Sequence, residues 1–166
     1  MEGVVVRASH ILYRWLRAIG LAPALAQLKP TDHFFRHIKK TWIDVDFVEP
    51  AAFRLRTKDD GQIEKGLSVN WVEYFRKPTP QEAIGALIEI FRKKGRKAGP
   101  ESRFALLNVG EAKNAAAKYT TVAVVFDEER DDPSHALVTG YEKYNDQVAE
   151  ELAKVIINKF PPNPSK

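Results

Sequence analysis

Two runs in the middle of the chain alternate apolar and polar residues. The run AFRLR places Arg54 and Arg56 on one face of a strand, and the run GLSVNWV does the same for Ser68 and Asn70. The predicted strands are residues 52–56 and 66–72, each burying one face. If they pair, two guanidiniums, a hydroxyl and an amide face an anionic ligand together. The alternative is the ordinary solvated face of an antiparallel sheet.

The loop between these runs sets a condition on their pairing. A tight two-residue turn at Asp60 and Gly61 would place Phe53 opposite Ser68, and directly opposed residues share a face of the sheet. Apolar and polar faces would then be mixed. An odd-length loop, or one extra residue in the ladder with Gly66 as the bulge candidate, restores the pattern. We therefore expect an irregular hairpin, or two strands that are not direct neighbours.

Helical periodicity is clearest at residues 80–94. Thr79 forms a capping box with Glu82, and Pro80 takes the first helical position. The other predicted helices are 10–19, 31–42, 111–118 and 146–158, the last capped by Asn145. The predicted strands are 42–48, 104–109, 119–126 and 136–139, and a strand at 11–15 is the alternative to the first helix.

This order of elements predicts an α+β or mixed α/β fold, in which helices pack on one mixed or antiparallel sheet. We expect a single globular domain over residues 1–160 and a short proline-rich tail at 161–166. Hydrophobic residues make up 44% and charged residues 29%, as in a soluble globular protein.

Composition removes several kinds of chemistry. The chain has no cysteine, which excludes disulfides, thiolate zinc sites and cysteine nucleophiles. Arg7, Arg14 and Arg17 interrupt the apolar start, so we expect no membrane span and no signal-peptide core, and a cytoplasmic protein. Glycine-rich phosphate loops of the GxGxxG and Walker types are missing, and we expect no cofactor.

Charge is unevenly distributed along a chain of net charge +4. Lys93, Lys94 and Arg96 belong to a dense basic stretch at the end of the predicted helix 80–94, whereas residues 127–132 are acidic. Cations near a helix carboxyl end complement its dipole, which is a sufficient structural role. Their density exceeds that need and also suits phosphate contacts.

Histidines offer two further hypotheses. His33 and His37 would share a face of a helix and hold a metal with Asp32 or Asp44, but partly exposed histidines are the favoured interpretation and we expect no metal. His135 at the start of a strand is a candidate general base, reached by Asp131 or Asp132; a structural histidine is the alternative.

Short patches of the chain carry two resemblances. ILYRW, AAFRLR, GLSVNW and PSHALVTGY resemble small bacterial proteins of uncharacterised function, which implies a single-domain bacterial protein. Arg14 or Arg54, then Ser68, then Glu128 follow the order of key residues in ADP-ribosyltransferases. The Ser-Thr-Ser run and the Glu-x-Glu or Gln-x-Glu turn of that family are missing. That resemblance implies a small transferase.

Taken together, the sequence favours a binding module rather than an enzyme, and this module contacts nucleic acid or another phosphate-bearing partner. The expected phosphate contacts are Arg54, Arg56, Lys93, Lys94 and Arg96. The enzyme alternative is a small transferase or hydrolase whose pocket combines Arg54, Ser68 and His135. A third alternative is a subunit that binds a protein partner through an exposed patch involving Phe34, Phe35 or Trp71, although Phe34 and Phe35 also suit the core.

Overall fold

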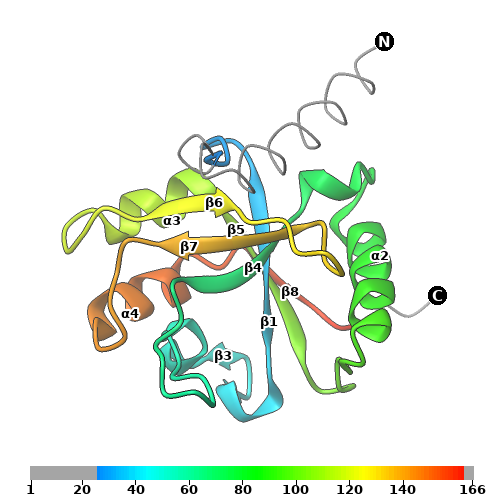
Figure 1. Ribbon diagram of the computed structural model, residues 1–166, viewed down its shortest axis with the longest axis horizontal. Helices are drawn as coiled ribbons and strands as arrows, with labels where there is room; N and C mark the ends of the chain where they lie inside the picture. Colours follow the sequence, from blue (N-terminus) through cyan, green and yellow to red (C-terminus); the bar gives the residue numbers. More distant parts are fainter. Residues whose placement is uncertain (1–25, 163–166) are drawn as a thin grey trace.

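A six-stranded antiparallel sheet forms the centre of the computed structural model, which describes residues 26–162 (Figure 1). The strand order is β6-β7-β4-β1-β5-β8. Its strands are β1 (His33–Ile38), β4 (Leu67–Trp71), β5 (Arg103–Asn108), β6 (Ala123–Phe126), β7 (His135–Thr139) and β8 (Asn158–Phe160). A small hairpin pairs β2 (Ile43–Asp44) with β3 (Phe47–Val48). The α+β prediction, with helices packed on one antiparallel sheet, is confirmed.

Helices cover both faces of this sheet. The described helices are α2 (Pro80–Lys93), α3 (Val109–Ala116) and α4 (Asp146–Lys154), with short 3-10 helices η1 (Lys40–Trp42), η2 (Pro50–Phe53) and η3 (Glu73–Phe75). Neighbouring residues of one strand point to opposite faces. Phe35 packs in the cluster with α2, whereas Phe34 packs in the cluster with α3 and α4. Figure 1 shows α2 on one side of the sheet and α3 and α4 on the other.

Local capping signals place the helix ends. The Thr79 hydroxyl accepts a hydrogen bond from the Glu82 backbone N–H and donates one to its carboxylate, as the capping box predicts. Asn145 caps α4 by accepting from the backbone N–H of Val148. The helices predicted at 80–94 and from residue 146 are confirmed at these ends, because the signals that start them are local.

The helix predicted at 31–42 is wrong. Residues 33–38 form β1, which pairs along its whole length with β5 and also contacts β4. Phe34 and Phe35 are fully buried on opposite faces of the sheet, which a strand achieves and an amphipathic helix does not. The interpretation of both rings as core is confirmed, and neither ring contributes to an exposed patch.

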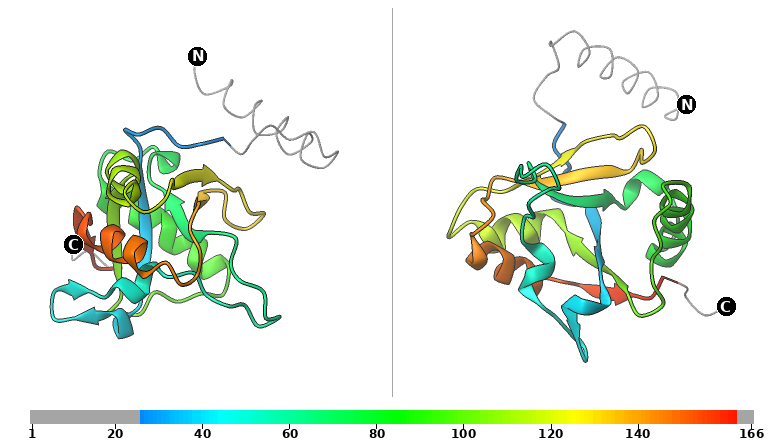
Figure 2. Two further views of the ribbon diagram at one scale, coloured as in Figure 1. Left: turned by 90° about the vertical axis from the view of Figure 1, so that its left-hand side faces the viewer. Right: turned by 60° about the horizontal axis from the view of Figure 1, so that its bottom comes forward.

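The strand predicted at 52–56 is also wrong. Pro50 begins the 3-10 helix η2, which ends at Phe53, and β4 pairs with β1 and β7 instead. The expected irregular hairpin between 52–56 and 66–72 is therefore not formed. A smaller turn lies between them: Lys58 N–H donates to the Gln62 carbonyl, so residues 59–61 form a three-residue turn. Gly61 takes the left-handed conformation in it, at φ 81°. Figure 2 shows the segment between η2 and β4 extending away from the sheet.

Other predictions need smaller corrections. The segment 42–48 is a short hairpin rather than one strand, β6 begins only at Ala123, and α4 ends at Lys154, after which β8 forms a strand that the helical pattern concealed. The predictions at 10–19 and 11–15, and the last four residues of the tail, lie outside the described residues.

At the centre of the sheet, β1 pairs over a much shorter length with β4 than with β5. β1 and β4 pair only at Phe34 with Trp71 and at Phe35 with Asn70, whereas β1 and β5 stay paired from His33 to Ile38. Beyond Phe35 the strands β1 and β4 therefore separate and leave a split between them. On the far side of β4, the backbone of Gly66 lies against β7.

Replacement of Gly66 by Ala should destabilise the protein. A Cβ at this position would lie 2.9 Å from both the Val138 carbonyl oxygen and the Thr139 methyl carbon, so β4 and β7 would have to move apart. We expect a loss of about 1–3 kcal/mol in the free energy of unfolding, measured by urea denaturation. Gly85→Ala is the matched control: no atom lies within 4 Å of its added Cβ, and helix propensity favours it by up to about 1 kcal/mol. Equal effects of the two substitutions would contradict the close approach.

Candidate anion-binding site

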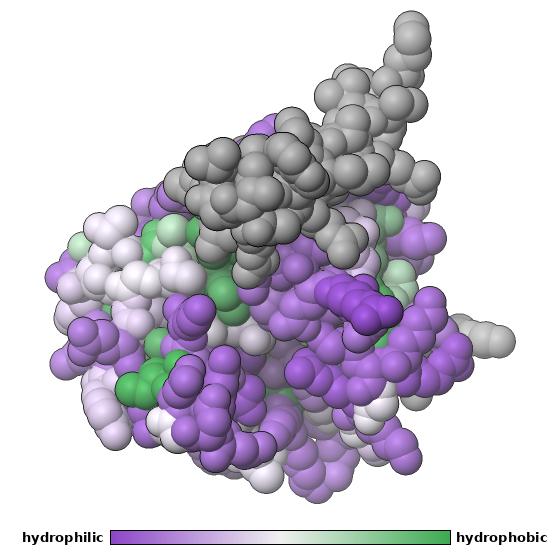
Figure 3. Space-filling model, viewed as in Figure 1, coloured by the Kyte–Doolittle hydropathy of each residue, from purple (hydrophilic) through white to green (hydrophobic). Residues whose placement is uncertain are grey.

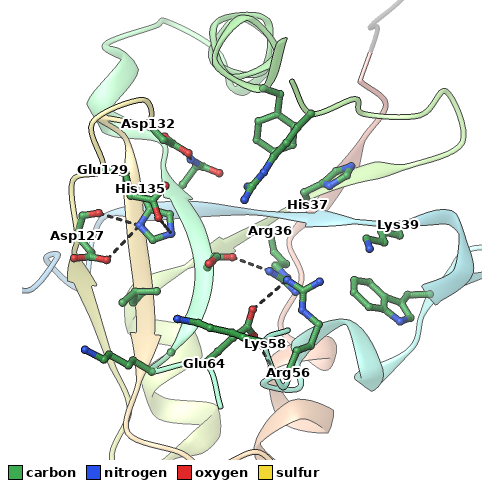
Figure 4. Close-up of a pocket in the computed structure, with 18 of the residues that line it drawn as sticks. Arg36, His37, Lys39, Arg56, Lys58, Glu64, Asp127, Glu129, Asp132 and His135 are labelled. Carbon is green, nitrogen blue, oxygen red and sulfur yellow. Dashed lines mark hydrogen bonds and ion pairs between the residues drawn. The ribbon is translucent and has the colours of Figure 1, made fainter. Parts of the chain in front are cut away.

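A pocket of about 590 Å³ lies on the half of the sheet face that α2 leaves uncovered (Figure 4). Ser68 and Asn70 of β4 and His135 of β7 line it, because alternation turns these polar residues away from the core below α3 and α4. The loop 55–66, the loop after α2 and the connection between β6 and β7 surround it. Hydrophilic residues dominate the face of the molecule seen in Figure 3.

Arg36 fills the split between β1 and β4. Its Nε donates to the Ala52 carbonyl at 3.0 Å and its Nη1 to the Ser68 carbonyl at 2.8 Å. The residue is only 5% exposed, and its guanidinium carbon lies 5.9 Å from the centre of the Trp42 ring. Among the described residues, none of the ion pairs includes Arg36. A buried cation is therefore held by neutral oxygen atoms.

Burial and, to a smaller extent, the positive charge of Arg56 lower the pKa of Arg36 to about 10. The Tyr141 hydroxyl and Glu64 oppose this fall but do not cancel it. The guanidinium remains charged at neutral pH. An anion placed against it would relieve both causes, since it would supply the missing opposite charge.

Arg56 stands beside Arg36 at the mouth of the pocket. Its Nη2 lies 3.2 Å from Glu64 Oε1, and its backbone N–H donates to Glu64 Oε2 at 2.9 Å. Both oxygens of the Glu64 carboxylate thus accept from Arg56. The basic residues lining the whole pocket are Arg36, Lys39, Arg56, Lys58, Lys65, Arg96 and Lys97, and the acidic ones are Glu64, Asp127, Glu129 and Asp132. Cations outnumber carboxylates, so the pocket favours an anion.

A carboxylate cluster forms the opposite end of the pocket. Asp132 is 1% exposed and accepts hydrogen bonds from the Asn70 side-chain amide at 3.1 Å and from the Ser134 hydroxyl at 2.9 Å. Lys94 Nζ lies 2.5 Å from Glu129 and 3.7 Å from Asp132. Lys94 therefore neutralises acidic side chains of the protein instead of presenting a charge for a phosphate.

His135 is fixed by its surroundings. Its Nδ1 lies 2.9 Å from the Asp127 carbonyl oxygen, and because a carbonyl only accepts, Nδ1 carries the proton. Its Nε2 lies 3.7 Å from Glu129 Oε1. In the neutral ring Nε2 is an acceptor. The prediction that Asp131 or Asp132 reaches the ring is wrong, since the carboxylates beside it belong to Asp127 and Glu129.

His37 lines the other side of the pocket against two aromatic rings. The centre of its ring lies 5.3 Å from that of Phe91 and 5.2 Å from that of Phe104, and its buried Nε2 has no hydrogen-bond partner. Burial, together with the smaller effects of the charges on Arg36, Lys39 and Arg96, lowers its pKa to about 4. His37 is consequently neutral at pH 7.

The two histidines of β1 do not share a ligand. Four residues of strand separate them by about 13 Å, and His33 Nδ1 bonds to Glu73 at 2.8 Å. Within residues 26–162, no group of three or more His, Cys, Asp or Glu side chains is arranged to hold a metal ion.

The structure brings some of the predicted site residues together and separates others. Arg56, Arg96, Ser68 and His135 line the pocket. Arg54, which directly follows η2, lies outside the pocket and pairs with Asp146 at 2.8 Å. Lys93 is exposed on α2 and Glu128 follows β6; neither lines the pocket.

Arg36 was missed by the sequence reasoning. The available signal was a cation enclosed in the apolar run FFRHI. On a strand that lies between two partner strands, the side chain of this cation has no solvated face to occupy. The helix predicted for this stretch hid that signal, since a helix would have offered Arg36 an exposed side.

Comparisons with protein-family models, with curated proteins and with solved structures find no match for this chain. None of the helices in the described part is both long and apolar enough to cross a membrane. The function must therefore be argued from the pocket itself.

Acid should weaken the fold through His37. Its pKa is lower in the folded protein than its ordinary value of 6.5, so on acidification the unfolded chain takes up the proton first. The free energy of unfolding should fall as the pH drops from 6.5 to about 4, by at most about 3 kcal/mol. Denaturation across this range should show that His37→Phe loses part of this dependence, whereas His33→Phe retains it. An unchanged pH profile in His37→Phe would contradict a neutral buried ring.

Proposed function

We propose that this protein is a binding module for a phosphate-bearing ligand, either a nucleic acid or a nucleotide, whose phosphate lies against Arg36 and Arg56. The observation that carries this proposal is the burial of Arg36, at 5% exposure, without an ion-pair partner among the described residues but at the wall of an open pocket. Protein interiors rarely contain a charge that lacks an opposite charge. A ligand anion supplies it.

The hydrogen-bonding capacity of Arg36 supports the proposal. The Ala52 and Ser68 carbonyls occupy Nε and one N–H of Nη1. A guanidinium has further N–H donors, in a planar fork that matches the oxygens of phosphate. The two carbonyls fix the plane of the fork, so little side-chain freedom would be lost when an anion binds.

The shape of the site favours a single phosphate group over a long track of backbone contacts. Arg56, Arg96 and Lys97 converge on one concave site, whereas the rest of the basic stretch is directed elsewhere. Arg92 pairs with Glu89, and Lys94 pairs with Glu129. Of the phosphate contacts expected from the sequence, the proposal therefore keeps Arg56 and Arg96, which line the pocket.

An enzyme is the second candidate, favoured by His135. The ring lines the same pocket, its Nδ1 is held by the Asp127 carbonyl, and its Nε2 is left as an acceptor. A base oriented in this way beside an anion site suits a transferase or hydrolase acting on a phosphate-bearing substrate. In this version Arg36 takes the place expected for Arg54, in one pocket with Ser68 and His135.

Arg56→Gln should weaken ligand binding, and Arg54→Gln should not. The two side chains are equally exposed, at 46% and 48%, each pairs with one carboxylate, and only Arg56 lines the pocket. We expect about tenfold weaker binding of a fluorescently labelled single-stranded RNA by Arg56→Gln at low salt, measured by anisotropy. Inorganic phosphate should displace the RNA from the wild-type protein.

Two results would contradict the proposal. One is the absence of any RNA binding at low salt together with no heat of binding for inorganic phosphate. The other is an equal loss of affinity in Arg54→Gln and Arg56→Gln, which would indicate a general effect of surface charge. Arg36→Lys provides a second variant that keeps the buried charge but removes the fork, and it should weaken binding at least as much as Arg56→Gln.

A further inference from the structure

The pocket has two chemically different ends. Figure 4 shows Arg36, Arg56 and Lys58, the cationic end, across the pocket from Asp127, Glu129 and Asp132, the acidic end. A simple anion matches only the first. Because the volume of about 590 Å³ lies within the usual range for small-molecule sites and exceeds the needs of a lone phosphate, the ligand should reach both ends.

The acidic end presents two acceptors side by side. Glu129 Oε2 is taken by Lys94, which leaves Oε1 at 3.7 Å from His135 Nε2, beyond hydrogen-bond distance. In the neutral ring, where His135 Nδ1 holds the proton, Nε2 accepts. Burial raises the pKa of Glu129, but the Lys94 hydrogen bond and the nearby charges of Lys94 and Arg96 outweigh it and lower the pKa, so Oε1 is ionised. The complement to this pair is a donor with more than one N–H.

Lys94 reduces the attraction of this end for a second ammonium group. Lys94 already places a positive charge 2.5 Å from Glu129 and 3.7 Å from Asp132. Another cation would meet repulsion from Lys94, whereas a neutral amino group would donate hydrogen bonds without adding charge. His37, Trp42 and Phe91 also line the pocket with rings, which suits a flat aromatic body.

We propose that the occupant is a nucleotide whose base carries an exocyclic amino group, with the phosphate at the cationic end and the amino group donating to Glu129 and His135. This inference rests on the proposed phosphate site and names its ligand class. Cytosine, adenine and guanine carry such a group, and a carboxylate accepting from cytosine N4 is an established pairing. Uracil presents a carbonyl oxygen there, which would face the Glu129 carboxylate and be repelled.

Titration calorimetry with CMP and UMP tests the proposal, since the two nucleotides differ only at that edge of the base. We expect CMP to bind about tenfold more tightly than UMP at low salt. Glu129→Ala should reduce CMP binding to the level of UMP and leave UMP unchanged or slightly tighter. Asp131→Ala is the matched control, because this exposed residue of the same connection does not line the pocket, and it should keep the preference.

Equal binding of CMP and UMP while inorganic phosphate still binds would overturn this inference and leave the proposed function standing. Phosphoethanolamine binding as tightly as CMP would also overturn it, by showing that an aliphatic ammonium group is the true partner of the acidic end. If none of the nucleotides and no inorganic phosphate bind, the proposed function itself fails. A preference for CMP that survives in Glu129→Ala would overturn the role given to that carboxylate.

Discussion

The buried guanidinium of Arg36 is the interaction on which the arrangement of the site depends. It donates to the Ala52 carbonyl in η2 and to the Ser68 carbonyl in β4 while its own backbone belongs to β1. Three segments far apart in the sequence are joined by one side chain. Without it, two carbonyl oxygens facing the split would lose their donor, and burying an unpaired carbonyl is costly. The guanidinium that joins these three segments is also the positive charge that attracts a ligand.

Opposite charges in the pocket are kept apart by the strands that carry them. Three of the acidic side chains come from the connection between β6 and β7, and Glu64 comes from the loop before β4. The basic ones come from β1, the loop before β4 and the loop after α2. Lys94 reaches from the end of α2 to the acidic side and partly neutralises it. This distribution gives the site a direction, so a ligand with unlike ends would bind in one orientation.

Local signals in the sequence were sufficient for much of the fold. The capping box at Thr79, the Asn145 cap and the apolar run of β5 each act within a few residues, and the structure follows them. The facing rule also correctly excluded a two-residue hairpin turn at Asp60 and Gly61, although residues 52–56 form no strand. These are constraints that a short stretch of chain imposes on itself.

Predictions failed where distant partners decide the outcome. Residues 33–38 satisfy a helical pattern, but β4 and β5 make them a strand, and neither partner is near in sequence. Arg54 and Arg56 alternate as if they shared a face, yet the end of η2 sends one to Asp146 and the other to the pocket. Tertiary placement, which no local pattern encodes, therefore determined which arginine belongs to the site.

The short ladder between β1 and β4 also has a consequence for motion. Only two residue pairs join the half-sheet β6-β7-β4 to the half-sheet β1-β5-β8 through this ladder, and the pocket opens directly beside it. Small rotations of one half against the other would change the width of the pocket while breaking few backbone hydrogen bonds. The centre of the sheet, usually the most rigid part of such a fold, is here a weakly paired boundary between two half-sheets. A ligand that contacts both halves would restrict their relative motion.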